Sequence, residues 1–250
     1  IIKMKLSEEN IREKNFHNEL QSKQTGRFEN IFYKAIYNAS EDFFNYLKIN
    51  SINAQILDFG CGIGSSIKEV IKFKPKKITG IDISEVSIQK AKDKNKDSEI
   101  ELELLVGNCE KTDFQNNKFD IVYGTGILHH LKMSACLEEI YRVLKPGGSF
   151  LFIEPLGTNP LINLYRNLTP KSRSDDEHPL VKNDLNLIKE KFFKTNIKYY
   201  GFLTLIFFPF YKSPKNSFLF NFLKKLDQIL FKLNIFKNLA WSVLIVATKN

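Results

Sequence analysis

The sequence has few cysteines and no long apolar run. Cys61, Cys109 and Cys136 are its three cysteines, an odd number at wide spacing that fits neither a disulfide framework nor a zinc motif. No stretch reaches the roughly 18 apolar residues of a membrane-spanning helix, and the strongest one, GFLTLIFFPF at 201–210, ends at a proline. The charged N-terminus is not typical of a signal peptide. These features predict a cytoplasmic protein with reduced thiols.

Acidic residues are outnumbered by basic ones. Lys and Arg total 37 against 28 Asp and Glu, which gives a formal net charge of +9. Such a surplus is typical of proteins that bind nucleic acid, anionic membranes or acidic substrates. The lysines are scattered along a chain that is also rich in Asn and Ile, so compositional bias accounts for them. We therefore do not expect nucleic acid as a partner.

Strands and helices alternate from residue 51 onward. Strands are expected at 54–59, 76–82, 100–108, 119–125 and 149–155, with helices at 65–73, 85–94 and 135–144. This alternation predicts right-handed crossovers and a parallel sheet that carries helices on both faces.

The two ends of the chain have a different character. Residues 1–50 are expected to form a helical cap, since apolar residues from Phe28 to Ala39 recur at helical spacing. Residues 156–182 predict a long loop. A helix at 183–193, a strand at 195–206, an amphipathic insert at 207–238 and a last strand at 240–248 are expected to follow.

Three glycines come directly after the first expected strand. The stretch ILDFGCGIG (56–64) places Gly60, Gly62 and Gly64 between a strand and a helix. In doubly wound sheets, ligands bind beyond the carboxyl ends of the strands, where glycines let them approach the backbone and a helix N-terminus. Asp82 ends the next strand, where an acidic residue can accept hydrogen bonds from ribose hydroxyls. The pattern predicts a nucleoside-containing ligand.

That ligand is not expected to be a dinucleotide. Counted from Gly60, the third glycine of the G-x-G-x-x-G fingerprint should stand where Ser65 stands, and counted from Gly62 it should stand at Ile67. Asp58, beside the loop, would also repel a pyrophosphate and suits a cationic ligand. A nicotinamide dehydrogenase is therefore disfavoured.

Five segments in this order resemble the class I S-adenosylmethionine-dependent methyltransferases, specifically their type 11-like small-molecule subgroup. They are ILDFGCGIG (56–64), ITGIDIS (78–84), LLVGNCEKTDF (104–114), FDIVYGTGILHHL (119–131) and VLKPGGSFLFIEP (143–155). The resemblance implies a Rossmann-like domain over 51–250, preceded by the cap. Its fold class is α/β: a doubly wound, mostly parallel seven-stranded sheet with an antiparallel last strand and a helical insert before that strand.

The resemblance also implies a cofactor and the residues that bind it. S-adenosylmethionine would be the methyl donor, S-adenosylhomocysteine the product, and no metal is expected. The cofactor-binding residues would be Asp58, Gly60, Cys61, Gly62, Gly64, Asp82, Ile83, Asn108, Cys109, Gly124 and Thr125. Asp58 and the glycine backbone would hold the methionine end, Asp82 the ribose, and Ile83 the adenine. Asn108 stands where relatives usually have an Asp that reaches the adenine amino group.

The acceptor side is expected beyond the strands at 119–125 and 149–155. Methyl transfer is an in-line displacement that needs a positioned acceptor and, for a hydroxyl, a base. The candidate catalytic residues are His178, His129 and Glu154, and the candidate substrate-binding residues are Tyr33, His130, Arg166 and Arg173. Three of these seven residues, Arg166, Arg173 and His178, lie in the charged loop 156–180, for which a solvated loop is the alternative. His17 and Phe28 of the cap are further pocket candidates, with plain packing as the alternative.

Several functions stay open at this point. The main hypothesis is methyl transfer to an oxygen of a polar or anionic small molecule, such as a sugar-, nucleotide- or phosphate-linked metabolite. The alternative is a quinone-like or lipid acceptor at the membrane surface, and a non-catalytic cofactor-binding module is a third. Residues 216–236 form an amphipathic helical face. That face predicts packing on the domain, peripheral contact with the inner membrane face, a homodimer contact, or a pocket wall for a lipid-like acceptor.

Overall fold

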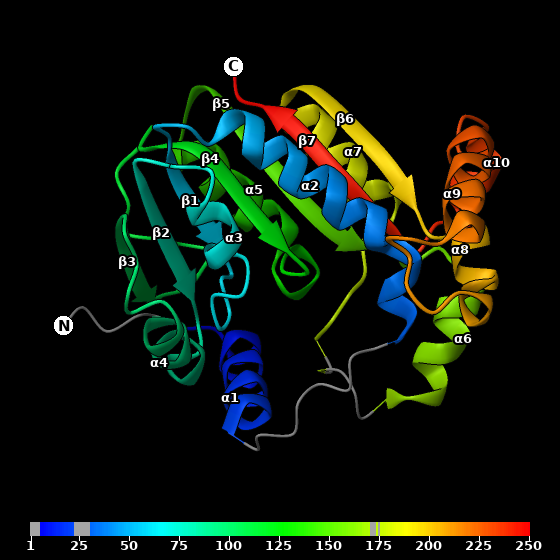
Figure 1. The fold of residues 1–250 in the computed structure, drawn as a ribbon. Coiled ribbons are helices and arrows are strands. Elements are labelled where there is room, and N and C mark those ends of the chain that lie inside the picture. The colour runs from blue at the N-terminus through cyan, green and yellow to red at the C-terminus, as the bar shows by residue number, and fades with distance from the viewer. Residues whose placement is uncertain (1–5, 23–30, 171–173, 175) are drawn as a thin grey trace.

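The computed structural model describes residues 6–22, 31–170, 174 and 176–250. Its centre is one seven-stranded sheet with the order β3-β2-β1-β4-β5-β7-β6 (Figure 1). The strands are β1 (Gln55–Phe59), β2 (Lys77–Asp82), β3 (Glu101–Val106), β4 (Phe119–Thr125), β5 (Leu144–Pro155), β6 (Phe193–Tyr200) and β7 (Ser242–Thr248). The first five are mutually parallel, whereas β7 runs antiparallel to both neighbours. The expected fold class is confirmed.

Helices cover both faces of this sheet (Figure 1). They are α1 (Glu8–Ser22), α2 (Tyr37–Asn50), α3 (Ile67–Ile71), α4 (Glu85–Lys94), α5 (Met133–Val143), α6 (Pro160–Leu168), α7 (Lys182–Lys191), α8 (Leu203–Ile206), α9 (Phe218–Leu230) and α10 (Asn234–Lys237). Short 3₁₀ turns η1 (Ile31–Ile36), η2 (Leu128–His130) and η4 (Phe208–Phe210) connect some of them.

Two apolar cores lie on opposite faces of the sheet. Successive strand residues point to opposite sides, so Ile56 of β1 packs in the core with α2 and α4, whereas Leu57 packs in the core with α5 and α7. Tyr123 and Val122 of β4 divide in the same way. Because both faces are covered, the central strands bury apolar side chains on both sides.

The expected loop at 156–182 contains a helix, α6. Asn159 caps it, since its side-chain oxygen accepts hydrogen bonds from the backbone N–H groups of Leu161 and Ile162. Pro160 occupies the first turn, where its missing N–H is no loss. The prediction of an unbroken loop was wrong because these capping signals were outweighed by the polar composition around them.

The strand expected at 195–206 is shorter than predicted. β6 ends at Tyr200, and Gly201 follows with a φ of +79°. A side chain there would be strained by this left-handed backbone and would bring a Cβ to 2.8 Å from Ile36. The chain therefore turns at Gly201 and enters α8.

Candidate functional site

A cavity of about 540 Å³ opens beyond the carboxyl ends of β1, β2 and β4. Strand β1 lies between β2 and β4. From β1 the chain builds the sheet first toward β3 and then toward β5, so β1 and β4 border the switch point of the strand order. Sheets of this kind bind ligands at that switch point. The loop after β1 and the ends of β2, β3 and β4 form one side. Helix α1 forms the other side with Asn10, Glu13, His17, Leu20 and Gln21.

The glycine loop has a left-handed backbone conformation, which residues with a side chain rarely adopt. Gly60, Gly62 and Gly64 have φ angles of +76°, +52° and +68°. A Cβ at Gly60 would come within 2.4 Å of Ile127, and one at Gly64 within 2.8 Å of the Asn95 amide nitrogen. A Cβ at Gly62 would meet nothing within 4 Å. Gly62 therefore borders open space and leaves backbone accessible to a ligand.

Asp82 joins this loop to the end of β2. Its carboxylate accepts hydrogen bonds from the backbone N–H groups of Gly62 and Ser84, each at 2.9 Å. Burial raises the pKa of Asp82, although these two bonds oppose the shift. Asp82 and the neighbouring Ile83 both line the cavity. The acidic residue and the glycine loop thus face the same space.

Asn108 lies at the far end of the cavity, just after β3. Its amide nitrogen donates to the Asn10 side chain at 3.1 Å, and its oxygen accepts from the Glu110 backbone N–H at 2.9 Å. Cys61, Cys109 and Thr125 also line the cavity. A glycine backbone, a buried carboxylate and an amide at the switch point fit a ligand made of an amino-acid part, a ribose and an adenine.

Three residues expected to bind the cofactor do not line the cavity. Asp58 is buried below the loop, where its carboxylate accepts hydrogen bonds at 2.8 Å from the hydroxyls of Ser66 and Tyr123. Burial raises the pKa of Asp58 to about 7. Gly64 packs against α4, and Gly124 leaves no room for a side chain because a Cβ would come within 2.6 Å of Phe152. These residues shape the site from behind.

Glu154 and His129 are buried together after β5 and β4. The Glu154 carboxylate accepts hydrogen bonds from the backbone N–H groups of Ile127 (2.9 Å) and Leu128 (2.8 Å), and it lies 2.7 Å from His129 Nδ1. Neither side chain lines the cavity, whereas Ile127 and His130 do. The pair holds the turn after β4, and the catalytic role expected of Glu154 and His129 stays a prediction.

The other expected acceptor residues lie away from the cavity. The His178 ring is exposed, although its backbone N–H donates to His129 O at 2.8 Å. Tyr33 is 56% exposed and its ring packs near Trp241. Arg166 Nη2 lies 3.9 Å from Glu177 Oε1. Arg173 and Phe28 lie outside the described residues. Of the expected substrate-binding residues that the structure describes, only His130 lines the cavity.

Helix α1 supplies residues that were not expected. Residues at three- and four-residue spacing face the cavity: Asn10, Glu13, His17, Leu20 and Gln21. Of these only His17 was a candidate. The signal was present as helical periodicity, but in polar residues, which a search for an apolar face does not detect.

Glu13 is the buried carboxylate among these residues. Burial alone would raise its pKa, but the imidazoles of His130 and His17 and the Ser174 hydroxyl outweigh burial and lower that pKa below its usual range. A charged carboxylate and two imidazoles therefore meet at the α1 side of the cavity.

Sheet order, glycine loop and the acidic residue after β2 together define a class I, Rossmann-like methyltransferase fold. Residues 57–152 match the family model described as a methyltransferase domain, so this part of the chain is similar to that family.

Similar curated proteins are sterol methyltransferases. Sterol 24-C-methyltransferase ERG6 of Saccharomyces cerevisiae is 35% identical over 102 residues, which cover 40% of this chain and 27% of that protein. The 24-methylenesterol C-methyltransferase 3 of Arabidopsis thaliana is 33% identical over 126 residues, covering 49% and 32%. The matches thus span less than a third of each relative's length.

Solved structures share the fold at lower identity. Phosphoethanolamine N-methyltransferase 2 of Haemonchus contortus, in complex with S-adenosylhomocysteine, superposes with a TM-score of 0.68 at 19% identity, covering 94% of this chain and 59% of that one. A geranyl diphosphate methyltransferase gives a TM-score of 0.61 at 14% identity, covering 84% and 76%. At these identities the likeness concerns the fold alone.

Proposed function

We propose that this protein binds S-adenosylmethionine in the cavity and transfers its methyl group to a small-molecule acceptor. The observation that carries the proposal is the common orientation of the glycine loop and Asp82 toward one cavity at the switch point of the sheet. The family match of residues 57–152 supports it. When bound, the cofactor supplies an electrophilic methyl group on a sulfonium.

Different residues of the cavity would bind different parts of the cofactor. Asp82 has a carboxylate in reach of the cavity and would accept hydrogen bonds from ribose hydroxyls. Ile83 offers an apolar wall for a purine, and Asn108 a polar group beside it. The backbone at Gly62 would contact the amino-acid part. Helix α1 closes the opposite side and excludes water from the reacting atoms.

For the acceptor we favour an apolar or amphiphilic molecule, such as a lipid. Similar curated proteins are named as sterol methyltransferases. The main hypothesis of a polar or anionic acceptor depended on Arg166 and Arg173, but Arg166 is near Glu177 and outside the cavity, and Arg173 lies outside the described residues. An acceptor with an anionic group remains the second candidate, because the protein carries a net charge of +9.

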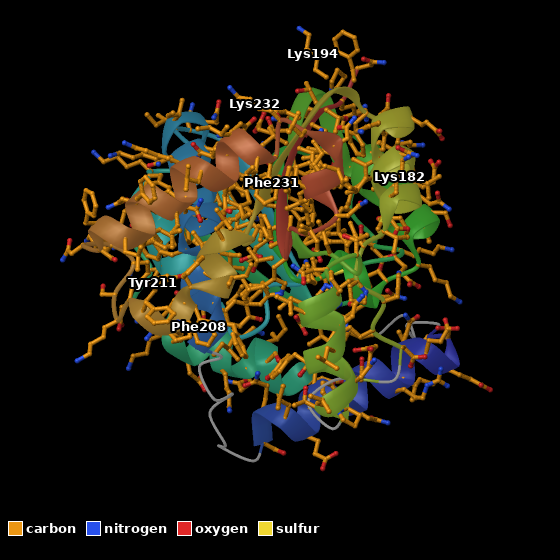
Figure 2. All side chains as sticks on the ribbon, turned by 90° about the vertical axis from the view of Figure 1, so that its right-hand side faces the viewer. Lys182, Lys194, Phe208, Tyr211, Phe231 and Lys232 are labelled. Carbon is orange, nitrogen blue, oxygen red and sulfur yellow. The ribbon has the colours of Figure 1, made fainter. Side chains whose placement is uncertain are left out.

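A surface suited to a membrane supports the lipid proposal. Helices α6, α8, α9 and α10 gather at one edge of the molecule (Figure 1), which faces the viewer in Figure 2. Exposed apolar side chains on them are Leu161, Leu164, Leu168, Ile206, Phe218, Phe222, Ile229 and Ile235. We call this set the apolar edge. On α9, Phe218, Phe222 and Ile229 form a stripe on the outer face, since they are four and seven residues apart.

The exposed charges of residues 201–250, which include α8, α9 and α10, are basic. Asp227 is the only acidic residue between positions 201 and 250, and it is buried. Its carboxylate accepts hydrogen bonds from backbone N–H groups at the start of α8. Lys212, Lys215, Lys225 and Lys232 are exposed in the same region. Exposed apolar residues among lysines fit the surface of an anionic membrane. No helix of the described residues is long and apolar enough to cross one.

Two measurements test the function. Calorimetry should show binding of S-adenosylmethionine, and Asp82→Ala should weaken it by about 1–3 kcal/mol, the usual loss for hydrogen bonds to a charged acceptor. Asp97→Ala, an exposed carboxylate on the surface, is the matched control. Unchanged affinity in Asp82→Ala would remove Asp82 from the site, and the absence of binding would overturn the proposal.

Acceptor class is tested by turnover. The protein is incubated with the labelled cofactor and either lipid vesicles from a cell extract or the aqueous fraction of the same extract. We expect label in the lipid fraction and formation of S-adenosylhomocysteine. Label only in aqueous products would favour the anionic acceptor. Binding without turnover in either fraction would favour a non-catalytic cofactor-binding module.

A further inference from the structure

Helix α1 carries a glutamate and a histidine one turn apart, directly over a second histidine. Glu13 and His17 are separated by four residues and so share one face of the helix. His130 approaches them from the turn after β4. Glu13 Oε2 lies 3.5 Å from His17 Nε2 and 3.2 Å from His130 Nδ1. One ligand atom of each residue lies within 4.8 Å of the other two.

Two of these atoms lack the partner that burial demands. The side chains of Glu13 and His130 are only 7% and 8% exposed. Glu13 Oε2 and His130 Nδ1 are both buried, and neither has a hydrogen-bond partner among the described residues. They are 3.2 Å apart but not aligned as a hydrogen bond. A buried polar atom without a partner is costly, so its presence calls for an explanation.

The two measured separations, from Glu13 Oε2 to each imidazole nitrogen, match those of ligands around one metal ion. Zinc binds histidine nitrogens and carboxylate oxygens at about 2.0–2.2 Å, which places two ligands of a tetrahedral site about 3.3 Å apart. The observed 3.2 and 3.5 Å agree with that separation. We propose that Glu13, His17 and His130 form a binding site for a divalent transition metal ion such as Zn²⁺.

The ligand set selects a metal and leaves a position open. Two imidazoles and one carboxylate suit Zn²⁺ and its first-row neighbours, whereas Mg²⁺ prefers oxygen ligands alone. Three protein ligands with a free fourth position are typical of catalytic sites. All three side chains line the cavity. The free position therefore faces the space proposed for methyl transfer, where the ion would bind a water or an acceptor oxygen and lower its pKa.

Neighbouring residues support this geometry. Ser174 donates its hydroxyl to Glu13 Oε1, the carboxylate oxygen that does not face the histidines. The rings of His129 and His130 pack with centroids 4.1 Å apart, and Glu154 holds His129 in place. Outer contacts of this kind orient metal ligands.

A second grouping, His129, His130 and Glu177, shares His130. It is the weaker candidate because His129 Nε2 lies 3.9 Å from Glu177 Oε1, farther than the about 3.3 Å between two ligands of a tetrahedral ion. The grouping on α1 is therefore the one that we assign.

The experiment measures metal binding without methyl donor or acceptor. The full chain is stripped with a chelator, dialysed against Zn²⁺, Co²⁺ or Mg²⁺, and its metal content is determined. We expect one equivalent of Zn²⁺ or Co²⁺ and none of Mg²⁺. Co²⁺ should also give the visible absorption bands of a tetrahedral site. Because this experiment involves no turnover, a negative result would leave the proposed methyl transfer untouched. Likewise, a lack of methyl transfer would not argue against the metal site.

Variants locate the site. His17→Ala should weaken Zn²⁺ binding at least about tenfold, since even the loss of an outer contact reduces metal affinity by 10–100-fold. His17 is the most exposed of the three ligands, at 27%, so the variant should fold. His178→Ala, which lies outside the cavity, is the matched control and should bind like the wild type. Equal binding in His17→Ala, or no metal in the wild type, would overturn the proposal.

Should His17→Ala prove unstable, His17→Cys offers a second route. A thiolate is also a zinc ligand, so this variant should retain Zn²⁺ and shift the Co²⁺ spectrum by adding a sulfur-to-metal band. A spectrum unchanged from the wild type would show that residue 17 does not touch the ion.

Discussion

Asp58 has an unusual environment for a carboxylate. It is buried below the glycine loop and accepts hydrogen bonds from the Ser66 and Tyr123 hydroxyls. Burial raises the pKa of Asp58 from its ordinary value of 3.8 to about 7. In the folded protein, Asp58 thus keeps a proton that it loses in the unfolded chain between these two pH values.

This shift predicts a pH dependence of stability. Because the folded state binds more protons in that window, the free energy of unfolding should fall as pH rises from about 4 to about 7 and then level off. Asp58→Asn should flatten the profile, with a difference of at most about 4 kcal/mol. Urea unfolding at a series of pH values measures it. Parallel profiles for the two proteins would contradict the assignment.

Glu154 holds the turn that places His130. Its carboxylate accepts hydrogen bonds from the Ile127 and Leu128 backbone N–H groups and is fully buried. Glu154→Ala would leave both donors without a partner, so we expect a loss of about 3 kcal/mol in the free energy of unfolding. Glu138→Ala, at a glutamate that is 72% exposed, is the control and should change little. Equal stabilities would exclude the anchoring role.

At the scale of elements, α1 differs from the other helices. Its only buried residues are polar, Asn10 and Glu13. Polar contacts dock it, including Ser84 to Asn18 and Arg12 to Asp176. By contrast, α2 buries Ala39, Phe43 and Leu47 against the sheet. Few buried apolar contacts mean a low free energy for local opening, which suits a lid.

Hydrogen exchange should reveal this difference. Without ligand, amides of residues 8–22 should exchange much faster than those of 37–50, and S-adenosylmethionine should slow the former selectively, because it fills the cavity that α1 covers. Helix α2 serves as the internal control. Equally slow exchange in both helices without ligand would show that α1 is not a separately opening element.

At the scale of the whole molecule, the positions of the apolar edge and of the cavity determine how the protein would lie on a membrane. The apolar edge and its lysines lie at the opposite end of the sheet from α4 (Figure 1). The cavity opens beyond the carboxyl ends of the strands. A protein bound to a membrane through the apolar edge would keep α4 and its exposed lysines in water.

Vesicle binding tests this orientation. Vesicles with anionic lipid should retain the protein at low salt, and added salt should weaken retention as it screens the lysines. Phe222→Ser and Lys225→Glu should each reduce binding, since both are exposed on α9. Lys92→Glu makes the same charge change on α4 and should have little effect. Equal loss in Lys225→Glu and Lys92→Glu would indicate attraction by net charge alone.

The sequence by itself determined the sheet, the glycine loop and Asp82. Each of these features depends on a short stretch of chain. They are the periodicity of the strands, the left-handed conformation at Gly60 and Gly62, and the acidic residue at the end of β2. Local propensities and a few neighbouring side chains are enough to establish such features. The alternation of strands and helices likewise predicted a parallel sheet with helices on both faces.

Only the tertiary structure decided which side chains face the cavity. His129 and His130 are adjacent in sequence, but one side chain points to Glu154 and the other lines the cavity. Glu13 and His130 are more than a hundred residues apart in sequence, yet their side chains are in contact. The His178 side chain lies outside the cavity, although the His178 backbone N–H donates to His129 O. These outcomes depend on how α1 docks and how the turn after β4 is held, and such long-range packing leaves no signature in local sequence.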